Sequence, residues 1–405
     1  MNILSINTFF PCPPRRGMDI IYLNLLKLQA QGHTVTVVVL VRTPEERRHV
    51  TEIATYCDRL VVVTPRNVDS YLFKAYYRIL YSLLSLLWWW PRCTFYGSPP
   101  ELRREVRRLT TEHCFDLVEI HHSTSAALRD DVGKGATALY LYDVHFRAKA
   151  RLAETKTGLA RLLALMEVSK FHRFETQAFR RFDLLMLGQE QDKVEVQKWV
   201  DAGVAVNLMP NVIDTDVVKT ARGVGPGERV AIFVGAMTHQ ANVDAVTNFF
   251  QAAWPQIVER VPGAEWWIVG ASPPEEIRAL DGQQGVRVFA DVPDVRPYIA
   301  KAAVYVAPLR IGSGVKVKIM EALALGKAIV ASPVAAEGMG LTAGMELEVA
   351  ELDDPFAAAV VRLFSDATRR AMLEANAREA AVKLFSVTAG VKTLAAAYDR
   401  LPVSR

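Results

Sequence analysis

Short apolar runs rich in β-branched residues alternate along the first half of the chain with longer segments that have a helical period. Because this alternation is typical of strand–helix–strand units, it predicts a mostly parallel sheet with helices on both faces. The strands expected in this half are 2–9, 34–41, 60–64, 115–120, 138–142, 183–187 and 206–209.

The second half repeats the pattern after a polar, glycine-containing stretch, 213–227, that has no apolar period. Its expected strands are 230–234, 266–269, 286–289, 304–307 and 328–331. A chain of 405 residues also exceeds the size at which one core keeps growing. We therefore expect an α/β protein of two Rossmann-like, doubly wound domains, 1–211 and 212–386. After a break at Phe385-Ser386, the amphipathic helix in 387–405 should pack back on the first domain.

The composition is that of a packed globular protein, with 51% hydrophobic and 23% charged residues and no low-complexity tract. Met1 leads directly into a strand-like run, so the sequence shows no secretory signal and we expect a cytoplasmic location. Cys12, Cys57, Cys93 and Cys114 are widely spaced, which argues against a disulfide framework and a zinc site. We expect buried or incidental thiols.

The apolar, aromatic stretch 71–90 raises the question of a membrane. Lys74 and Arg78 interrupt it, so we do not expect it to span a bilayer. One interpretation is an interfacial helix at the inner face of a membrane, with tryptophans at headgroup depth. The alternative is an aromatic helix that is partly buried or lines an acceptor groove.

Charge bears on that choice. Residues 1–200 hold 28 Lys and Arg against 21 Asp and Glu, and residues 201–405 hold 20 against 23. The basic half suits acidic headgroups or a phosphorylated acceptor, although ordinary solvated surface explains it as well. The pairs Arg103-Arg104 and Arg107-Arg108 recur on one helical face, which favours the membrane interpretation.

A loop after the strand 304–307 carries the most specific chemistry. In parallel sheets ligands bind at the carboxyl ends of strands. Gly312 and Gly314 let backbone N–H groups approach an anion, and the loop enters a helix expected to begin near Val315. Three cations surround this helix N-terminus, namely Arg310, Lys316 and Lys318. The loop is not a Walker A motif, and it predicts a diphosphate site.

Glu321 follows Lys318 by almost one helical turn, on a related face. A carboxylate accepts hydrogen bonds from hydroxyl groups, so we expect Glu321 to bind ribose hydroxyls. A diphosphate site next to a ribose site predicts that the protein binds a nucleotide.

At these residues the chain resembles a known family. PLRIGSGVKVKIMEALALGKAIVASPVAAEGM looks like the donor-site signature of the retaining GT-B glycosyltransferases of family 4, and closely like their bacterial exopolysaccharide branch. FVGAMTHQANVDAV, WWIVG and FADVPDVRPYIAKA follow in that family's order, and the likeness covers nearly the whole chain. The resemblance implies two Rossmann-like domains facing across a cleft, with the nucleotide sugar in the second and the acceptor in the first.

The chain departs from the family at two positions of the donor site. The family carries Glu-x7-Glu, whose second Glu is matched by Glu321 while Ser313 stands at the first. The resemblance implies that Ser313 and backbone amides replace a carboxylate contact to the sugar. Gly235 is followed by Ala236-Met237 where relatives often have an arginine, so the phosphate charge rests on the three cations. Val292 falls where the family holds the base through backbone contacts, and Glu337-Gly338 is a further candidate at the base or ribose edge.

In the first domain, Gly17 lies in the loop after the first strand, where relatives often have two glycines. The resemblance implies a close approach of this loop to the sugar or the diphosphate. A plain helix entry with Asp19 as N-cap is the alternative. His121-His122 end one strand, and a structural hydrogen bond is their simpler explanation. His145 follows the next strand, and the resemblance makes it the catalytic histidine, with Asp143 orienting it.

The expected activity is transfer of a hexose from a nucleotide diphosphate sugar, with UDP-sugar favoured over GDP-mannose, to a glycan or lipid-linked acceptor with retention. Asp214 and Asp216 form a DxD sequence, but their place at the domain junction indicates a linker or capping role, so no metal and no cofactor is expected. The alternatives are a GT-B-fold sugar-nucleotide epimerase and a non-catalytic binding protein of the same fold. A nucleic-acid partner is not expected, because the basic residues are scattered.

Overall fold

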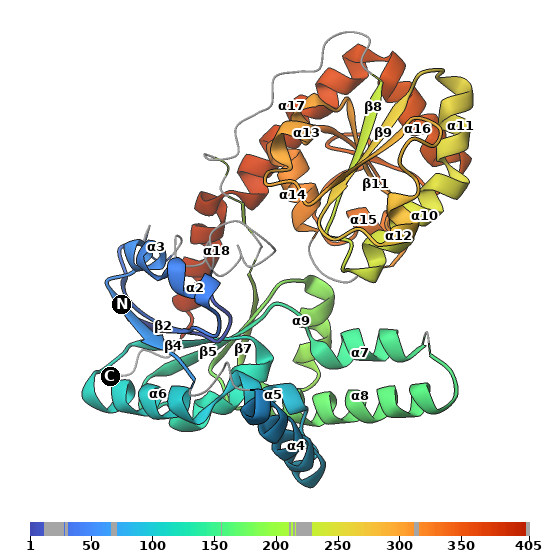
Figure 1. Cartoon of the computed structure of the whole chain (residues 1–405). Helices are drawn as coiled ribbons and strands as arrows, with labels where there is room; N and C mark the ends of the chain where they lie inside the picture. The colour runs from blue at the N-terminus through green and yellow to red at the C-terminus, as the bar shows by residue number, and fades with distance from the viewer. Residues whose placement is uncertain are drawn as a thin grey trace. The chain divides into compact units, whose positions relative to one another are not determined.

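The chain forms two compact units, each built around its own parallel sheet (Figure 1). Unit 1 comprises Met1–Asn211 and Gly390–Arg405, and unit 2 comprises Val212–Ala389. The computed structural model describes residues 1–11, 28, 31–65, 71–154, 156–209, 212–213, 215, 229–311 and 316–401, of which Glu45, 71–78 and Trp88 are described as backbone only.

The described part of unit 1 contains a seven-stranded parallel sheet in the order β3-β2-β1-β4-β5-β6-β7. Its strands are β1 (Asn2–Asn7), β2 (Thr34–Leu40), β3 (Arg59–Val63), β4 (Leu117–His121), β5 (Ala136–Leu141), β6 (Leu184–Leu187) and β7 (Ala205–Leu208). In the register, Ile3 pairs with Val35 of β2 on one side and with Leu117 of β4 on the other. The strand order reverses between β1 and β4, and such switch points are where open parallel sheets bind ligands.

Alternate residues of the unit 1 strands feed two separate cores, one on each face of the sheet. Leu4 and Val38 belong to one core, whereas Ile3 and Val37 belong to the other. Successive side chains of a strand point to opposite faces, and helices cover both, so near-continuous apolar strands are what a buried parallel sheet requires.

The helices in the described part of unit 1 whose bounds can be given are α2 (Pro44–Arg48), α3 (Val50–Ile53), η1 (Ala54–Tyr56), α4 (Tyr71–Trp88), α5 (Arg92–Gly97), α6 (Pro100–Glu112), η2 (Ser123–Asp131), α7 (His145–Glu154), α8 (Gly158–Phe179), α9 (Glu190–Gln197) and most of α18 (Val387–Tyr398). Leu394, Ala397 and Tyr398 of α18 are buried in the same core as Ile3. The end of the chain thus packs on the first sheet.

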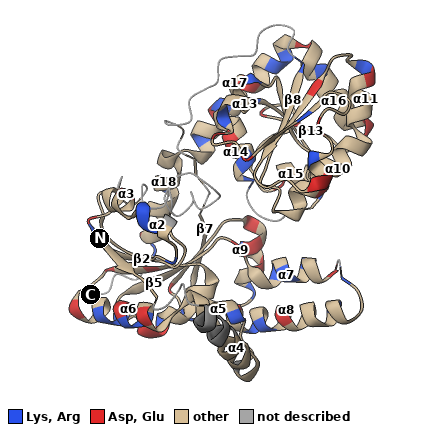
Figure 2. Cartoon of the chain, viewed as in Figure 1, with Lys and Arg blue, Asp and Glu red and all other residues tan. Residues whose placement is uncertain are grey.

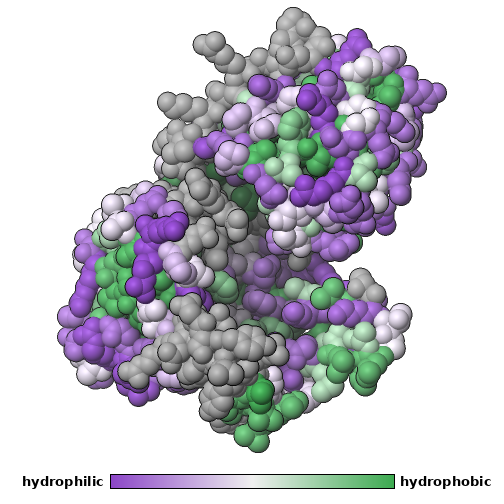
Figure 3. Space-filling model, viewed as in Figure 1, coloured by the Kyte–Doolittle hydropathy of each residue, from purple (hydrophilic) through white to green (hydrophobic). Residues whose placement is uncertain are grey.

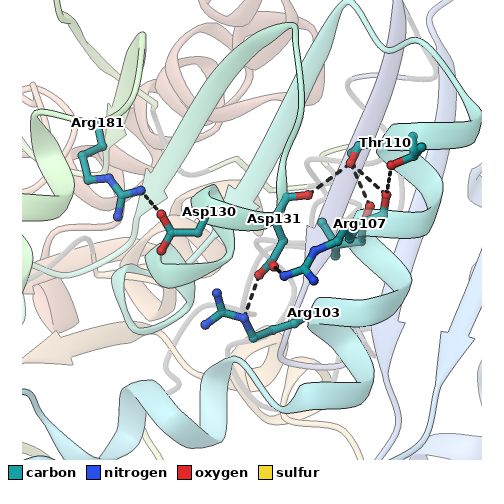
Figure 4. A network of polar contacts seen from close by, with 8 residues as sticks. Arg103, Arg107, Thr110, Asp130, Asp131 and Arg181 are labelled. Atoms are coloured by element: carbon teal, nitrogen blue, oxygen red, sulfur yellow. Dashed lines mark hydrogen bonds and ion pairs between the residues drawn. The ribbon is translucent and has the colours of Figure 1, made fainter.

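The arginines of α6 are held by the protein itself (Figure 4). Arg103 Nε lies 2.8 Å and Arg107 Nη2 2.5 Å from the carboxylate of Asp131, whose side chain is fully buried at the end of η2. Arg108 pairs with Glu105 and Glu112 on its own helix. Three of the four arginines thus pair with carboxylates of the chain, and the membrane interpretation of these pairs stays a prediction.

Unit 2 contains, in its described part, a six-stranded parallel sheet in the order β10-β9-β8-β11-β12-β13. Its strands are β8 (Val230–Val234), β9 (Glu265–Gly270), β10 (Val286–Ala290), β11 (Val304–Ala307), β12 (Ala328–Ala331) and β13 (Glu348–Val349). Its helices are α10 (Gln240–Ala252), α11 (Trp254–Arg260), α12 (Glu275–Arg278), α13 (Arg296–Lys301), α14 (Val317–Ala324), α15 (Pro333–Ala336), α16 (Asp354–Ser365) and α17 (Ala367–Phe385). The order reverses between β8 and β11, so the second switch point lies there.

The structure confirms each of the twelve strands expected from the sequence and the α/β class with two doubly wound sheets. The break at Phe385-Ser386 is also confirmed, since α17 ends at Phe385 and α18 begins at Val387. Cys57 and Cys93 are half-buried free thiols, and Cys114 is an exposed one. In the ranges that the structure describes, no helix is long and apolar enough to cross a membrane.

Candidate functional site

In unit 2 the loops that follow β8 and β9 contact each other beside the switch point. Gly235 N donates to Val269 O at 3.0 Å, and Met237 N donates to Ala271 O at 2.9 Å. A Cβ on Gly270 would lie 1.9 Å from the carbonyl oxygen of Gly235. The two backbones therefore approach so closely that Gly270 admits no side chain.

Asn242 of α10 connects this loop to a lysine. Its side chain is nearly buried, with 6% exposed, and its Nδ2 donates to Ala236 O at 2.7 Å. Its Oδ1 accepts a hydrogen bond from Lys318 Nζ of α14. The same ammonium lies 5.0 Å from the centroid of the Phe233 ring, over the end of β8. One amide thus fixes the loop after β8 and the cation after β11 relative to each other.

Burial changes the acid–base behaviour of Lys318. Removal from water, together with the positive charge of Lys316, lowers the pKa of Lys318 from 10.5 to about 8. An ammonium held in this way is favoured by a negative charge placed beside it, because the anion replaces lost hydration. The site is prepared for an anion.

Two further cations, Arg310 and Lys316, lie in the segment between β11 and α14. Arg310, exposed just after β11, donates through Nη1 to Asn248 Oδ1 of α10. Lys316 is the N-cap residue of α14 and is 8% exposed, and its carbonyl accepts from Ile319 N at 2.7 Å. The structure brings Arg310, Lys316, Lys318 and Gly235 together at one sheet edge. Gly312, Ser313 and Gly314 lie outside the described residues, as does Val315.

Glu321 and Val292 border this edge. Glu321 is half-buried on α14, and burial together with the charge of Glu321 raises the pKa of Tyr305 on β11. Val292 follows β10 and packs partly buried against the core, next to Asp291, whose carboxylate accepts from Ser272 N at 2.8 Å. Glu321 lies about one helical turn beyond Lys318. Val292, in contrast, lies in the loop that follows β10, beside the loop that follows β9.

In unit 1 the polar cluster lies at the ends of β4 and β5 and is built around Glu175. This carboxylate comes from the C-terminal part of α8 and is fully buried. It accepts hydrogen bonds from Ser123 Oγ at 2.6 Å and from the backbone N–H groups of His145 and Phe146 at 3.2 and 3.0 Å. The His145 ring approaches it through Nδ1 at 3.1 Å. Glu175 therefore anchors the first turn of α7.

His145 gains a defined orientation from these contacts. Burial lowers the pKa of its ring, but the hydrogen bond and the charge of Glu175, with a smaller effect of Asp143, outweigh it and raise the pKa above 6.5. Since Nδ1 faces a carboxylate, Nδ1 carries the proton and Nε2 is left for a ligand. The ring stacks on Phe171 at 5.2 Å and stays about 30% exposed. Asp143 is exposed and acts on the ring through its charge.

The two histidines at the end of β4 differ. His121 is fully buried between Ser5, Glu119 and Tyr142, and its Nδ1 lies 2.7 Å from the Tyr142 hydroxyl. This environment favours the structural interpretation of His121. His122 has a φ of 73°, and among the described residues its Nε2 is buried without a hydrogen-bond partner. Burial, with the charges of His121 and His145, lowers the pKa of His122 to about 3, so the ring is neutral.

Sequence reasoning missed Glu175, Asn242 and Asn248, and a periodicity signal was present for two of them. Glu175 shares the helical face of Phe171, Phe174 and Ala178, all buried. Asn242 shares that of Ala245, Val246 and Phe249. A polar residue on an apolar helical face is buried and needs partners, which marks it as a candidate. Asn248 carries no such signal. Gly17, Asp214 and Asp216 lie outside the described residues.

Comparisons with known proteins show what the chain is similar to. The model of the family "Glycosyl transferases group 1" matches residues 228–366, which include the whole cation cluster of unit 2. A phosphatidyl-myo-inositol mannosyltransferase of Mycolicibacterium smegmatis is 26% identical over 292 residues, which are 69% of this chain and 70% of that protein.

Solved structures resemble the whole chain. Anabaena HepE in complex with UDP aligns over 99% of this chain and 100% of its own, with a TM-score of 0.67 and 14% identity. Sucrose-phosphate synthase from Thermosynechococcus elongatus aligns over 99% of both chains, with a TM-score of 0.70 and 15% identity. The chain therefore has the GT-B fold, and residues 228–366 are similar to the group 1 glycosyl transferases.

Proposed function

We propose that the protein is a retaining hexosyltransferase that takes its sugar from a nucleotide diphosphate donor, with UDP-sugar as the first choice. The observation that carries the proposal is Lys318, a half-buried ammonium at the β8/β11 switch point that Asn242 holds and whose pKa is lowered to about 8. Lys316 and Arg310 add positive charge at the same edge, and a helix N-terminus contributes its dipole. A diphosphate satisfies all of them.

The other parts of the donor have partners in the same unit. Glu321 lies one turn beyond Lys318, where its carboxylate accepts from ribose hydroxyls. The loop with Val292 holds the base through the backbone. In support, Anabaena HepE, which has this fold, was solved in complex with UDP. GDP-mannose is the second choice for the donor.

The reaction that we propose is a front-side displacement. The bond between sugar C1 and the diphosphate oxygen breaks, and the acceptor oxygen bonds to C1 on the same face. The acceptor proton passes to the departing diphosphate oxygen. Lys318, Lys316 and Arg310 stabilise the negative charge that develops there, which is the main catalytic task in such a site. The bonds and charges of this step balance without a metal ion or a further cofactor.

In unit 1, His145 is the residue that we propose to contact the reacting sugar. Glu175 holds its Nδ1, so Nε2 accepts a hydrogen bond from a sugar hydroxyl or donates one when the ring is protonated. Asp143 adds negative charge beside the ring. Gly17 is proposed to let the loop after β1 come near the donor. The acceptor is a glycan or a lipid-linked molecule.

A transfer assay tests the proposal. The full chain is incubated with UDP-glucose, UDP-galactose, UDP-N-acetylglucosamine or GDP-mannose and with a lipid-linked or glycan acceptor, and the products are analysed by mass and by the NMR coupling of the anomeric proton. We expect a new glycoside with the donor's configuration. We also expect that His145→Ala lowers the rate about 100-fold or more while nucleotide binding remains.

The alternative enzyme is separated in the same assay. An epimerase converts the nucleotide sugar without an acceptor, so an altered free sugar nucleotide or free sugar would contradict transfer. A binding protein would neither transfer nor hydrolyse the donor. A glycoside of inverted configuration would overturn retention and leave the donor site standing.

A further inference from the structure

The described part of helix α4, residues 79–87, exposes leucine and isoleucine side chains and buries Tyr81 and Ser85. Of the residues 79–87, those that are exposed are Ile79, Leu83, Leu86 and Leu87, with exposed fractions of 57% to 76%. Their spacing places them on one helical face, the α4 face. Inside, Ser85 is 3% exposed and donates to Trp90 O at 2.5 Å. A helix in water has the opposite arrangement, so the α4 face is made for an apolar environment.

Contacts at the end of α4 fix this orientation. Lys170 of α8 donates to Ser85 Oγ at 3.1 Å and lies 5.4 Å from the Trp89 ring centroid. Trp89 Nε1 donates to Ser169 Oγ at 3.1 Å, and Trp90 meets Phe174 edge-on. Rotating α4 to hide its leucines would break these contacts, so the exposed face is a stable property of unit 1.

A second apolar surface lies at the end of the α7–α8 hairpin (Figure 1). In α8, the first residue that is buried is Lys170, and the twelve preceding residues are exposed or half-buried. The exposed leucines there, which we name the hairpin tip, are Leu152, Leu159, Leu162, Leu163 and Leu165, with exposed fractions of 46% to 71%. Figure 3 shows both surfaces as green areas at the ends of these helices.

The charges around both surfaces are mainly positive. Residues 71–92 contain Lys74, Arg78 and Arg92 and no Asp or Glu, and residues 145–165 contain five Lys or Arg against Glu154 alone. Arg92 lines a shallow groove with Ile79, Leu83 and Leu86. Figure 2 shows that the described part of α4 carries no charge of either sign, while α7 and the start of α8 carry mainly blue residues.

We propose that the α4 face and the hairpin tip dock unit 1 on an anionic lipid bilayer. Leucines enter the boundary between headgroups and acyl chains, while Arg92, Arg151, Lys156 and Arg161 meet the phosphates. A second copy of the chain fits less well, because two like-charged surfaces would repel each other. The proposal does not depend on the transfer reaction, and it extends the membrane contact expected of 71–90 to the hairpin.

Vesicle co-sedimentation of the full chain tests the surface. We expect binding to phosphatidylcholine vesicles that contain phosphatidylglycerol, and binding at least about ten-fold weaker to phosphatidylcholine alone or at high salt. The double variants Leu83→Ser/Leu87→Ser and Leu159→Ser/Leu163→Ser should each weaken binding about ten-fold or more, because each loses two inserted side chains. The matched control, Met372→Ser/Val382→Ser, removes two exposed apolar residues of unit 2 and should bind as the unchanged chain does.

A second measurement avoids reliance on leucine removal. An environment-sensitive fluorophore is attached to Leu163→Cys, in a chain whose exposed Cys114 is replaced by serine, and to Val382→Cys in the same background. We expect a blue shift on anionic vesicles at position 163 and none at 382. Absence of vesicle binding by the unchanged chain, or equal binding by the leucine variants, overturns the proposal. So does a dimer in ultracentrifugation that these variants convert to monomer, since the surface would then join two copies.

Discussion

At the scale of single residues, the two candidate site residues Lys318 and His145 are each partly withdrawn from water and held by a partner side chain. Lys318 has the amide of Asn242 beside it, and His145 has the carboxylate of Glu175. Burial lowers the pKa of the first, whereas Glu175 raises the pKa of the second. These opposite shifts follow from the partner, since only His145 faces a negative charge.

Lys318 predicts a pH dependence of nucleotide binding. Its ammonium is protonated below pH 8, and a bound diphosphate favours that form, so binding takes up a proton above pH 8. The affinity for UDP should therefore be constant from pH 7 to 8 and fall above it, by up to about ten-fold per pH unit. Calorimetric titrations between pH 7 and 9.5 measure this.

The control is Lys318→Arg, which keeps its charge throughout that range and should give an affinity independent of pH. If the unchanged chain shows the same affinity at pH 7 and 9.5, Lys318 does not contact the phosphates.

Glu175→Gln should lower the pKa of the His145 ring, because the hydrogen bond to a carboxylate and its charge are both lost. NMR titration of the ring protons follows the change. The pKa of His145 in the folded chain lies above 6.5, so the pair contributes stability that is complete below pH 6.5 and disappears as pH rises through the folded pKa. The variant should therefore lose stability mainly at low pH.

Asp143→Asn is the comparison for Glu175→Gln. It removes a charge that acts on His145 without an equally close hydrogen bond, so its effect on the ring pKa should be smaller. A larger effect of Asp143→Asn would make Asp143 the residue that orients His145.

At the scale of elements, the sequence predicted the strands well because they are buried on both faces and therefore apolar throughout. The short strand β13 was missed, since its two residues include Glu348, which pairs with Arg362 and Arg369. The place of Arg310, Lys316 and Lys318 after β11 followed from the sequence, and their role in binding a donor stays a prediction. Asn242 and Glu175 were missed because they come from distant helices, and only the three-dimensional packing brings them to the strand ends.

Gly270→Ala tests the contact between the loops after β8 and β9. Its Cβ would lie 1.9 Å from Gly235 O, so the backbone must move, and we expect a loss of about 1–3 kcal/mol in unit 2 with weaker nucleotide binding. Gly203→Ala meets no atom within 4 Å and should change stability by about 0.5 kcal/mol or less. Thermal unfolding with and without UDP compares the two, and equal behaviour would remove the argument for a close approach.

At the scale of the whole molecule, the chain passes from unit 1 to unit 2 and returns, because α18 packs on the first sheet. A buried hydrogen-bond network holds α18 against the sheet of unit 1. Tyr398 donates to Glu119 of β4, and the hydroxyls of Tyr398 and Tyr140 lie 2.5 Å apart. Burial opposes ionisation, but His121, Tyr398 and Tyr140 outweigh it and hold the pKa of Glu119 below 4.5. The carboxylate therefore stays charged and depends on these hydroxyls.

Tyr398→Phe should destabilise unit 1 by about 1–3 kcal/mol, since the buried carboxylate of Glu119 loses a donor. Chemical denaturation measures the loss, and Tyr96→Phe, at an exposed position, serves as the control with little effect. Because the pKa of Glu119 is lowered, its contribution is present above pH 4.5 and is lost as pH falls through the folded pKa, so the two proteins should converge in acid. Equal stability at neutral pH would contradict this role of α18.

The central claim is that the cations at the β8/β11 switch point bind the diphosphate of a nucleotide whose ribose meets Glu321. Calorimetric titration of the full chain with UDP, GDP and ADP tests it most directly, with Lys318→Ala and Glu321→Ala as variants. We predict saturable binding of UDP to the unchanged chain, and binding at least about ten-fold weaker in each variant, as the loss of a charged hydrogen bond implies. Absence of binding by all three nucleotides, or unchanged affinity in both variants, would contradict the claim.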